Sequence, residues 1–345
     1  MTKTRVLIAE DSIAMQAALS SLLGEDARIE IVGVASDGAQ AIELACALRP
    51  DVITMDILMP ELDGVAAIER IMASAPSRIL VVSSIVDDRQ IDLTFQAMRA
   101  GALEAIGKPS SARPEALRMW GARVREAILL MAEVPVITRR LRRATTHSGH
   151  RIDAWGIVAS TGGPAALSVM LAALPHELPV PIFIAQHMAE GFTDGLVRWL
   201  ASQTKLRVLT AAAGLMPRPG HVYFAPDRRD LEIDAEGIMC LPEPRPRGHT
   251  PSGDRLLESL AKTYGSRGGG IVLTGMGDDG AAGLLALRHA GGVTLAQSRE
   301  SCVVFGMPQA AIERGAATDV LPLQGLVDAI RSTASMIKSE SGGRA

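Results

Sequence analysis

The sequence predicts an α/β protein of two domains, each with a doubly wound and mainly parallel β-sheet. Two observations lead to this prediction. The 345 residues exceed the size at which one hydrophobic core usually stops growing, about 250–300 residues. Short, nearly uninterrupted apolar runs also alternate with segments of helical periodicity, as buried parallel strands alternate with helices. Hydrophobic residues make up 48% and charged residues 21% of the chain, which excludes a largely disordered protein.

Residues 1–131 are predicted to form the first domain. Five apolar runs have the length and composition of strands, and a segment with helical spacing follows each of them. We expect the strands at residues 6–9, 29–35, 51–55, 79–82 and 102–106, and the helices at 13–23, 39–48, from 64, 91–100 and 114–131. Successive strand–helix units are typical of a doubly wound sheet, in which ligands bind at the carboxyl ends of the strands.

Polar side chains follow four of these strands. They are Glu10 and Asp11 after the first strand, Asp56 after the third, Ser83 after the fourth and Lys108 after the fifth. Each of these residues alone is explained as a solvated loop residue. Because the carboxyl ends of parallel strands share one edge of the sheet, we expect the five side chains to lie together. Crowded carboxylates repel one another unless a hard cation lies among them, and oxygen ligands suit Mg²⁺. Such a site could hold phosphoryl oxygens, with Asp56 as the phosphoryl acceptor.

Over residues 4–131 this pattern resembles the response-regulator receiver domain, which has a flavodoxin-like fold. The resemblance implies Mg²⁺ ligands at Glu10, Asp11, Asp56 and the backbone carbonyl of Leu58, phosphorylation of Asp56, and switch roles for Ser83 and Lys108. The loop motifs Met59-Pro60 and Asp63-Gly64 match the family as well. The chain departs from the family at Glu104-Ala105-Ile106, where the switch aromatic of the fifth strand is missing.

Residues 132–151 are predicted to form a basic, flexible linker. Pro135 ends the preceding helix, and the polar segment after it, with four arginines at 139–143, has no periodicity. The basic run suits either a solvated tether or an arm that binds nucleic acid or an acidic partner. We favour the tether, because the net charge is −3, aromatic residues make up only 3% and no basic patch flanks the run. We therefore predict no nucleic-acid partner.

Residues 152–338 are predicted to form the second domain, and residues 339–345 a frayed tail. We expect strands at 154–159, 181–185, 270–274 and 293–296, and helices at 165–174, 192–200, 252–264, 281–289 and 323–337. Residues 206–241 carry short β-rich runs separated by Gly and Pro. These runs indicate an antiparallel hairpin inserted in a Rossmann-like sheet.

Three strand ends of the second domain present a hydroxyl, an imidazole and a carboxylate. Ser160 follows the first strand, His187 the second, and Asp278 or Asp279 the third. Singly, a helix cap, a structural histidine or a turn explains each residue, but together they are the parts of a nucleophilic triad. Turn amides beside Ser160 and within Gly275–Gly277 are candidate oxyanion donors. The residue order and the lack of a G-x-S-x-G elbow differ from the α/β-hydrolases.

Several longer motifs carry a second resemblance. They are Ala-Ser-Thr-Gly-Gly-Pro at 159–164, Gln-His-Met at 186–188, Gly-Phe-Thr at 191–193, Ala-Pro-Asp at 225–227, His-Thr-Pro-Ser at 249–252 and Leu-Thr-Gly-Met-Gly-Asp-Asp-Gly-Ala-Ala-Gly at 273–283. Over residues 154–337 the chain resembles the chemotaxis protein-glutamate methylesterase of CheB type. The resemblance implies a catalytic triad of Ser160 as nucleophile, His187 as general base and acid, and Asp279 as orienting carboxylate, because the family's Asp directly precedes Gly-Ala-Ala-Gly. It also implies a backbone oxyanion donor at Met276, with Thr161 beside the nucleophile.

The same resemblance implies a phosphorylation-regulated serine esterase of two-component chemotaxis adaptation. This enzyme would hydrolyse γ-glutamyl methyl esters of chemoreceptors and deamidate receptor glutamines, with no cofactor for either reaction. Its implied partners are methyl-accepting chemoreceptors as substrates and a chemotaxis histidine kinase as phosphodonor. The chain departs from the family at Arg228-Arg229-Asp230, where a histidine is usual, and we expect no catalytic role there.

A cytoplasmic location is predicted, without direct membrane insertion. No apolar run approaches the ~18 uncharged residues that a membrane span needs, and the N-terminal residues lack the apolar core of a signal peptide. The three cysteines are far apart and have no metal-binding spacing. Two other functions compete with the esterase. The linker arginines alone support a DNA-binding response regulator, and the intact triad argues against a non-enzymatic adaptor.

Overall fold

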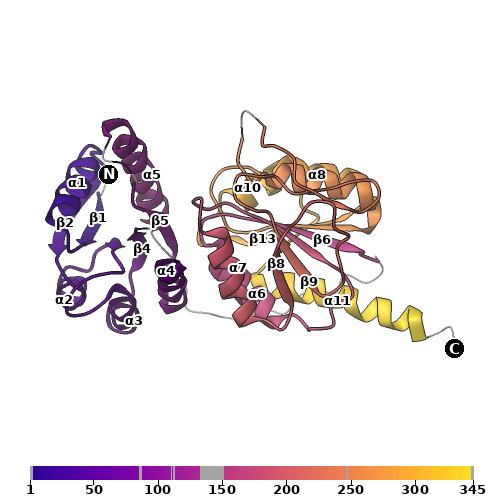
Figure 1. The fold of residues 1–345 in the computed structure, drawn as a ribbon, viewed down its shortest axis with the longest axis horizontal. Helices are drawn as coiled ribbons and strands as arrows, with labels where there is room; N and C mark the ends of the chain where they lie inside the picture. The colour runs from indigo at the N-terminus through magenta and orange to yellow at the C-terminus, as the bar shows by residue number, and fades with distance from the viewer. Residues whose placement is uncertain are drawn as a thin grey trace. The chain divides into compact units, whose positions relative to one another are not determined.

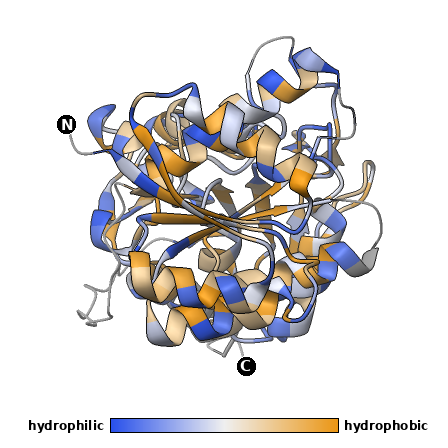
Figure 2. Cartoon of the chain, turned by 90° about the vertical axis from the view of Figure 1, so that its left-hand side faces the viewer, coloured by the Kyte–Doolittle hydropathy of each residue, from blue (hydrophilic) through white to orange (hydrophobic). Residues whose placement is uncertain are grey.

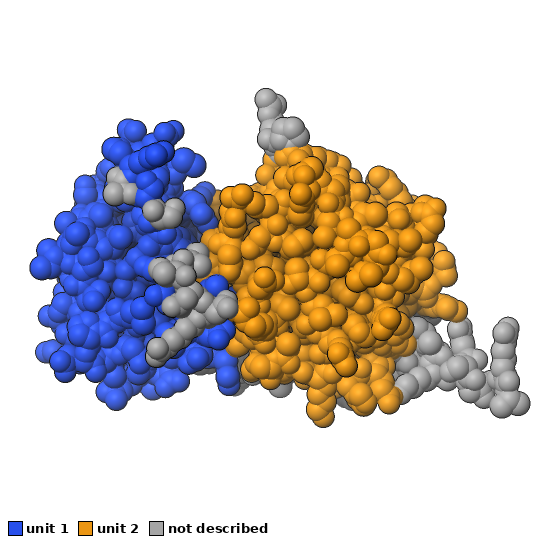
Figure 3. Space-filling model, viewed as in Figure 1, with its two compact units in different colours: residues 1–136 blue, residues 137–345 orange. Residues whose placement is uncertain are grey.

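The computed structural model describes residues 3–84, 88–109, 111, 113–132, 151–245 and 248–342, with only the backbone described for 88–89 and 333–342. The chain divides into two compact units, Met1–Val136 and Ile137–Ala345 (Figure 3). The predicted linker lies almost wholly outside the described residues, so its flexibility stays a prediction. Residues 339–342, which belong to the predicted tail, continue the last helix, and no proline or glycine lies between Gly325 and Gly342.

Five parallel strands alternate with five helices in the described part of the N-terminal unit (Figure 1). The elements are β1 (Thr4–Ala9), α1 (Ile13–Gly24), β2 (Ile29–Ala35), α2 (Gly38–Leu48), β3 (Val52–Met55), α3 (Gly64–Ser74), β4 (Arg78–Ser83), α4 (Asp88–Ala100), β5 (Glu104–Gly107) and α5 (Pro114–Ala132). The strand order is β2-β1-β3-β4-β5, with α1 and α5 on one face of the sheet and α2, α3 and α4 on the other. The predicted doubly wound fold of this unit is confirmed.

Short polar side chains begin three of these helices. The side-chain oxygens of Ser12, Asp37 and Asp63 each accept the backbone N–H of the residue three positions further on. The cap at Asp63 starts α3 directly beside the end of β3. A Cβ at Gly64 would lie only 2.1 Å from the carbonyl oxygen of Asp56, so this close approach requires glycine. The helix start therefore fixes the loop that carries Asp56.

A parallel sheet of seven strands forms the described C-terminal unit (Figure 1). Its strands are β6 (Ala154–Ala159), β7 (Ile182–Gln186), β8 (Arg207–Thr210), β9 (His221–Phe224), β12 (Gly268–Val272), β13 (Val293–Gln297) and β14 (Asp319–Leu321), in the order β14-β13-β12-β6-β7-β9-β8. Three helices cover one face, α6 (Gly163–Ala173), α7 (Thr193–Gln203) and α11 (Leu323–Gly342). The other face carries α8 (Gly253–Tyr264), α9 (Ala281–His289) and α10 (Met307–Glu313). The 3₁₀ turns are η1 (Gly265–Arg267) and η2 (Arg299–Ser301).

The antiparallel hairpin predicted within residues 206–241 is confirmed, but it takes up only part of this segment. The strands β8 and β9 extend the main sheet in parallel, with Val208 opposite Val222. The antiparallel hairpin is formed by β10 (Glu232–Ile233) and β11 (Met239–Cys240), which make a separate two-stranded sheet. The turn between these two strands is a local signal that marks the hairpin. The parallel pairing of β8 with β9 has no such local signal, because a loop without a helix joins them. The elements α10 and β14 were not predicted either.

Both main sheets are buried between helices. Every residue of β3, β6, β7 and β12 is buried. Figure 2 shows apolar residues along the strands and on the inward sides of the helices. This double burial explains the nearly continuous apolar runs in the sequence. In the described part of the chain, no helix is long and apolar enough to cross a membrane.

Candidate functional site

Three neighbouring strands bring the predicted triad residues to one edge of the C-terminal sheet. Strand β6 lies between β7 and β12 and pairs in parallel with both. Ser160 follows β6, His187 follows β7, and Asp279 lies in the turn between β12 and α9. The chain changes direction across the sheet at β6, and this is where open α/β sheets bind ligands.

His187 and Asp279 form a buried pair. The Nε2 atom of His187 lies 2.8 Å from Oδ2 of Asp279, and the two side chains are 11% and 6% exposed. Since a carboxylate accepts hydrogen bonds, this contact assigns the ring proton to Nε2 and leaves the lone pair on Nδ1. Among the described residues, Nδ1 is buried and has no hydrogen-bond partner. This atom is therefore available as a base for a hydroxyl.

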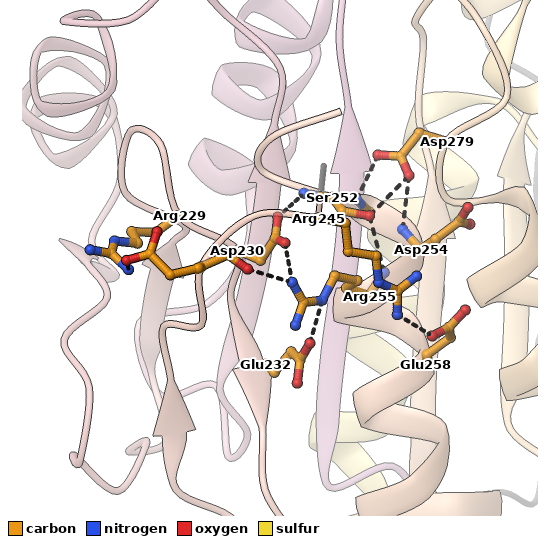
Figure 4. A network of polar contacts seen from close by, with 11 residues as sticks. Arg229, Asp230, Glu232, Arg245, Ser252, Asp254, Arg255, Glu258 and Asp279 are labelled. Carbon is orange, nitrogen blue, oxygen red and sulfur yellow. Dashed lines mark hydrogen bonds and ion pairs between the residues drawn. The ribbon is translucent and has the colours of Figure 1, made fainter. Parts of the chain in front are cut away.

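The N-terminus of α8 holds the Asp279 carboxylate (Figure 4). The N–H of Gly253 donates to Oδ2 at 2.6 Å, the N–H of Asp254 to Oδ1 at 3.0 Å, and the Ser252 hydroxyl to Oδ1 at 3.3 Å. Burial alone would raise the pKa of the Asp279 carboxyl. The hydrogen bond and charge of His187, together with the helix amides, outweigh burial and lower this pKa. The carboxylate thus stays ionised and can stabilise a protonated His187 ring.

The preceding carboxylate, Asp278, points elsewhere. Its side chain is 60% exposed and forms an ion pair with Arg314. Spacing alone left Asp278 and Asp279 as equal candidates, and the structure places Asp279 against the histidine.

Two side chains from the strand ends hold the turn of Ser160. The amide Nε2 of Gln186 donates to the carbonyl oxygens of Ser160 at 3.0 Å and His187 at 2.8 Å. The backbone carbonyl of Thr274 accepts the Ser160 N–H at 3.0 Å, and the Thr274 hydroxyl donates to the Thr161 carbonyl at 2.9 Å. These contacts tie the ends of β6, β7 and β12 together. Neither Gln186 nor Thr274 was predicted to have a role, although both stand in the family motifs.

The carboxylates of Glu10, Asp11 and Asp56 meet at the carboxyl edge of the N-terminal sheet. One oxygen atom of each lies within 4.8 Å of the others. Glu10 and Asp56 are buried, whereas Asp11 is exposed to solvent. A cluster of carboxylate oxygens that opens to solvent on one side fits Mg²⁺, which keeps several waters and binds phosphoryl oxygens.

Lys108 is the cation of this cluster. Its Nζ lies 2.6 Å from Oδ2 of Asp56 and 2.8 Å from Oε2 of Glu10. Burial raises the pKa of the Glu10 carboxyl, the charge of Asp56 adds to this, and Lys108 offsets it only in part. Burial alone would lower the pKa of the Lys108 ammonium, but the hydrogen bonds and charges of Asp56 and Glu10 outweigh it and raise this pKa. Lys108 therefore stays charged beside Asp56.

Two further predicted residues flank the cluster. Ser83 is buried at the end of β4, and its carbonyl accepts the N–H of Lys108 at 2.8 Å. The N–H of Leu58 donates to Oδ1 of Asp56 at 3.4 Å, and the Leu58 side chain is 46% exposed. The structure thus brings Glu10, Asp11, Leu58 and Lys108 close to Asp56, and it places Ser83 at the end of β4, the strand next to β3.

Comparison with known proteins identifies the family. The family model described as CheB methylesterase matches residues 155–330, and the model described as response regulator receiver domain matches residues 6–118. The chain is also 52% identical over 341 residues to protein-glutamate methylesterase/protein-glutamine glutaminase 3 of Myxococcus xanthus (strain DK1622), covering 98% of this chain and 96% of that protein. The chain belongs to the CheB methylesterase family.

Other CheB-family proteins are similar over comparable lengths. Protein-glutamate methylesterase/protein-glutamine glutaminase 4 of Geobacter metallireducens (strain ATCC 53774 / DSM 7210 / GS-15) is 41% identical over 343 residues, with 96% of this chain and 99% of that protein covered. The crystal structure of the Thermotoga maritima CheB methylesterase catalytic domain is 37% identical, with a TM-score of 0.50, and covers 52% of this chain and 97% of that domain. The predicted family and its order of domains, receiver first, are confirmed.

A second histidine of this CheB-family chain lies against His187. The rings of His187 and His249 are stacked, with centroids 4.6 Å apart and an angle of 11° between their planes. His249 is exposed and belongs to the motif His-Thr-Pro-Ser, for which no role was predicted. Its ring covers one face of the His187 ring and so restricts the ring's rotation.

In this CheB-family chain, Gly275 packs against the turn that carries Ser160. A Cβ at this position would lie 2.7 Å from Cβ of Ser160 and 2.2 Å from Sδ of Met307. We expect Gly275→Ala to displace Ser160 and the adjacent Met276 amide and to lower kcat about 10- to 100-fold, measured as methanol release. Gly24→Ala is the control, because nothing lies within 4 Å of its added Cβ. Equal kcat values for the two variants would contradict this prediction.

Proposed function

We propose that this CheB-family chain hydrolyses γ-glutamyl methyl esters of methyl-accepting chemoreceptors and deamidates receptor glutamines to glutamate. The names of its relatives, protein-glutamate methylesterase/protein-glutamine glutaminase, support both reactions. The observation that carries the proposal is the buried His187–Asp279 pair, which leaves Nδ1 of His187 as a base at the sheet edge that also carries Ser160.

Ester hydrolysis proceeds in two halves. The Ser160 hydroxyl oxygen attacks the ester carbonyl carbon while Nδ1 of His187 takes the hydroxyl proton. The tetrahedral intermediate then collapses, the imidazolium gives its proton to the methoxy oxygen, and methanol leaves a glutamyl ester on Ser160. Water attacks this ester with His187 again as base, which releases the glutamate carboxylate and restores the serine. Asp279 stabilises the imidazolium in both halves.

Deamidation follows the same route with a different leaving group. The glutamine side-chain amide replaces the ester, and His187 gives its proton to the departing nitrogen, so ammonia leaves instead of methanol. Both substrates pass through a tetrahedral oxyanion. The backbone amide of Met276 is the proposed donor to that oxyanion, and Thr161 supports the turn of the nucleophile through the hydrogen bond of its carbonyl to Thr274.

The N-terminal unit acts as the phosphorylation-dependent regulator. An oxygen of the Asp56 carboxylate accepts the phosphoryl group from a chemotaxis histidine kinase and becomes an acyl phosphate. When bound, Mg²⁺ would be held by Glu10, Asp11, Asp56 and the Leu58 carbonyl, and it would supply positive charge to the phosphoryl oxygens. Lys108 adds a second positive charge, and the hydroxyl of Ser83 contacts the phosphoryl group as the switch residue.

The proposed receiver domain is residues 1–131, the proposed catalytic domain residues 152–338, and the basic segment 132–151 links them. The division of the chain into two compact units supports these limits. We assign the protein to the cytoplasm, where the free cysteines Cys46, Cys240 and Cys302 would stay reduced. Chemoreceptors and the kinase are its partners, with no nucleic acid among them.

One experiment tests the activity and its regulation together. Purified methylated chemoreceptor is incubated with the full chain, with and without a small-molecule phosphodonor and Mg²⁺, and methanol release is measured. We expect release that rises when both phosphodonor and Mg²⁺ are present. No methanol under any condition would contradict the esterase activity, and equal release under all conditions would contradict the regulation.

A further inference from the structure

A buried ion pair lies beside the first turn of α8 (Figure 4). Oδ2 of Asp230 lies 2.6 Å from a terminal guanidinium nitrogen of Arg255, and the two side chains are 1% and 12% exposed. The Nε atom of Arg255 lies 2.5 Å from Oε1 of Glu232, and the same terminal nitrogen donates to the Glu243 carbonyl at 2.9 Å. The guanidinium is therefore held from several sides at once.

The second carboxylate oxygen of Asp230, which does not contact Arg255, faces the start of α8. Oδ1 of Asp230 accepts the backbone N–H of Ser252 at 2.7 Å. Ser252 is the N-cap of α8, and its hydroxyl accepts the N–H of Arg255 at 3.3 Å. Asp230 thus binds the backbone N–H of Ser252, and the backbone N–H of Arg255 binds the Ser252 hydroxyl. The N-cap residue is held at both of these groups.

The same turn binds the proposed orienting carboxylate. Asp279 receives hydrogen bonds from Ser252 and from the next two backbone amides, all within the segment that Asp230 and Arg255 hold. A shift of this turn would carry the Asp279 carboxylate with it. The hydrogen bond between Asp279 and Nε2 of His187 would then lengthen or turn, because His187 is fixed separately at the end of β7.

We propose that Asp230 and Arg255 are positioning residues, which set the orientation of Asp279 and through it of the His187 ring. This proposal rests on the proposed catalytic roles of His187 and Asp279. It adds a positioning role at Arg228-Arg229-Asp230, where the chain departs from the family's usual histidine and no catalytic role was predicted.

The chemistry of the pair favours positioning over simple stability. Removing two charges from water is costly, and well-packed apolar side chains in the same place usually stabilise a fold at least as well. An ion pair differs from apolar packing in that it fixes direction, because each oxygen and each N–H has one partner. Here one carboxylate oxygen meets the guanidinium and the other meets the N-cap amide, so the pair specifies where α8 begins.

Three variants of the full chain test the proposal, with kcat and KM for methanol release from methylated receptor as the measurements. We expect Asp230→Ala to lower kcat about 10- to 100-fold with KM unchanged. Asp230→Asn keeps an acceptor for the Ser252 N–H, so its kcat should fall less than that of Asp230→Ala. Glu232→Gln is the matched control: it removes a carboxylate from the same guanidinium but contacts neither Ser252 nor Asp279, and its kcat should stay within about twofold of wild type.

A spectroscopic readout separates positioning from a loss of fold. The proton on Nε2 of His187 should give a low-field ¹H NMR resonance while it is hydrogen bonded to Asp279. We expect this resonance to shift or broaden in both Asp230 variants and to stay in place in Glu232→Gln. If Asp230→Ala does not fold, as judged by circular dichroism, Asp230→Asn carries the test alone.

Two outcomes would overturn the inference. One is wild-type kcat and an unshifted resonance in the folded Asp230 variants. The other is an equal loss in Glu232→Gln, which would assign the effect to the charge of Arg255 instead of the contact with Ser252. Asp279→Asn, measured in parallel, tests the proposed function separately. Full activity in Asp279→Asn would contradict the proposed triad itself. Loss of activity in Asp279→Asn together with full activity in the Asp230 variants would contradict only this inference.

Discussion

Ser160→Ala is expected to lower kcat for methanol release about 10⁶-fold, the loss that removal of a nucleophilic serine usually causes. The alanine methyl group has no oxygen that could attack the ester, so the acyl intermediate cannot form. The fold should be unaffected, because the N-cap of α6 is Gly162 and no side chain, Ser160 included, caps this helix. Methanol release gives kcat, and thermal unfolding followed by circular dichroism should give the wild-type midpoint.

His187→Ala and the double variant extend this prediction. If Ser160 and His187 act as one unit, the double variant should be no slower than the slower single variant. A much larger loss in the double variant would show that the two residues act independently.

The chain also offers a matched pair of carboxylates. Asp279→Asn should lose most of kcat, because its amide cannot stabilise a protonated His187 ring. Asp278→Asn should keep it, because the Asp278 side chain is exposed and pairs with Arg314. Equal kcat values in these two variants would contradict the proposed role of Asp279.

The strand ends that carry both sites could be predicted from the sequence for a physical reason. Buried parallel strands are almost entirely apolar, so the first polar residue after each run marks the edge where ligands bind. Glu10, Asp56, Ser160 and His187 all stand at such a boundary.

The contacts that orient these residues could not be predicted in this way. Gln186 and Thr274 act on backbone carbonyl and amide groups of residues far along the chain, and backbone groups leave no mark in the sequence. The same holds for Asp230, whose partner Ser252 is 22 residues away. Which imidazole nitrogen faces Asp279 depends on the direction of the His187 ring, which spacing does not specify.

Asp56→Asn is expected to abolish phosphorylation of the chain. An asparagine amide cannot form an acyl phosphate, so no label should be transferred from a radioactive phosphodonor in the presence of Mg²⁺. The fold should survive, because the side-chain oxygen of asparagine can accept the N–H of Ile57, which now lies 2.7 Å from Oδ1 of Asp56. Lys108 keeps its second partner, Glu10. Asp63→Asn is the control, since asparagine caps a helix as well as aspartate does, and it should be labelled like the wild type.

The same variant separates the two proposed sites. Asp56→Asn should release methanol at the rate of the unphosphorylated wild type and should not respond to phosphodonor, whereas Ser160→Ala should accept the label and release no methanol. Label on Asp56→Asn, or label on the wild type after Mg²⁺ is chelated, would contradict the assignment of the acceptor and its cation. Loss of both label and basal methanol release in Asp56→Asn would instead give Asp56 a structural role. The expected pattern instead makes each active centre depend on its own nucleophile, the Asp56 carboxylate for phosphoryl transfer and the Ser160 hydroxyl for ester hydrolysis.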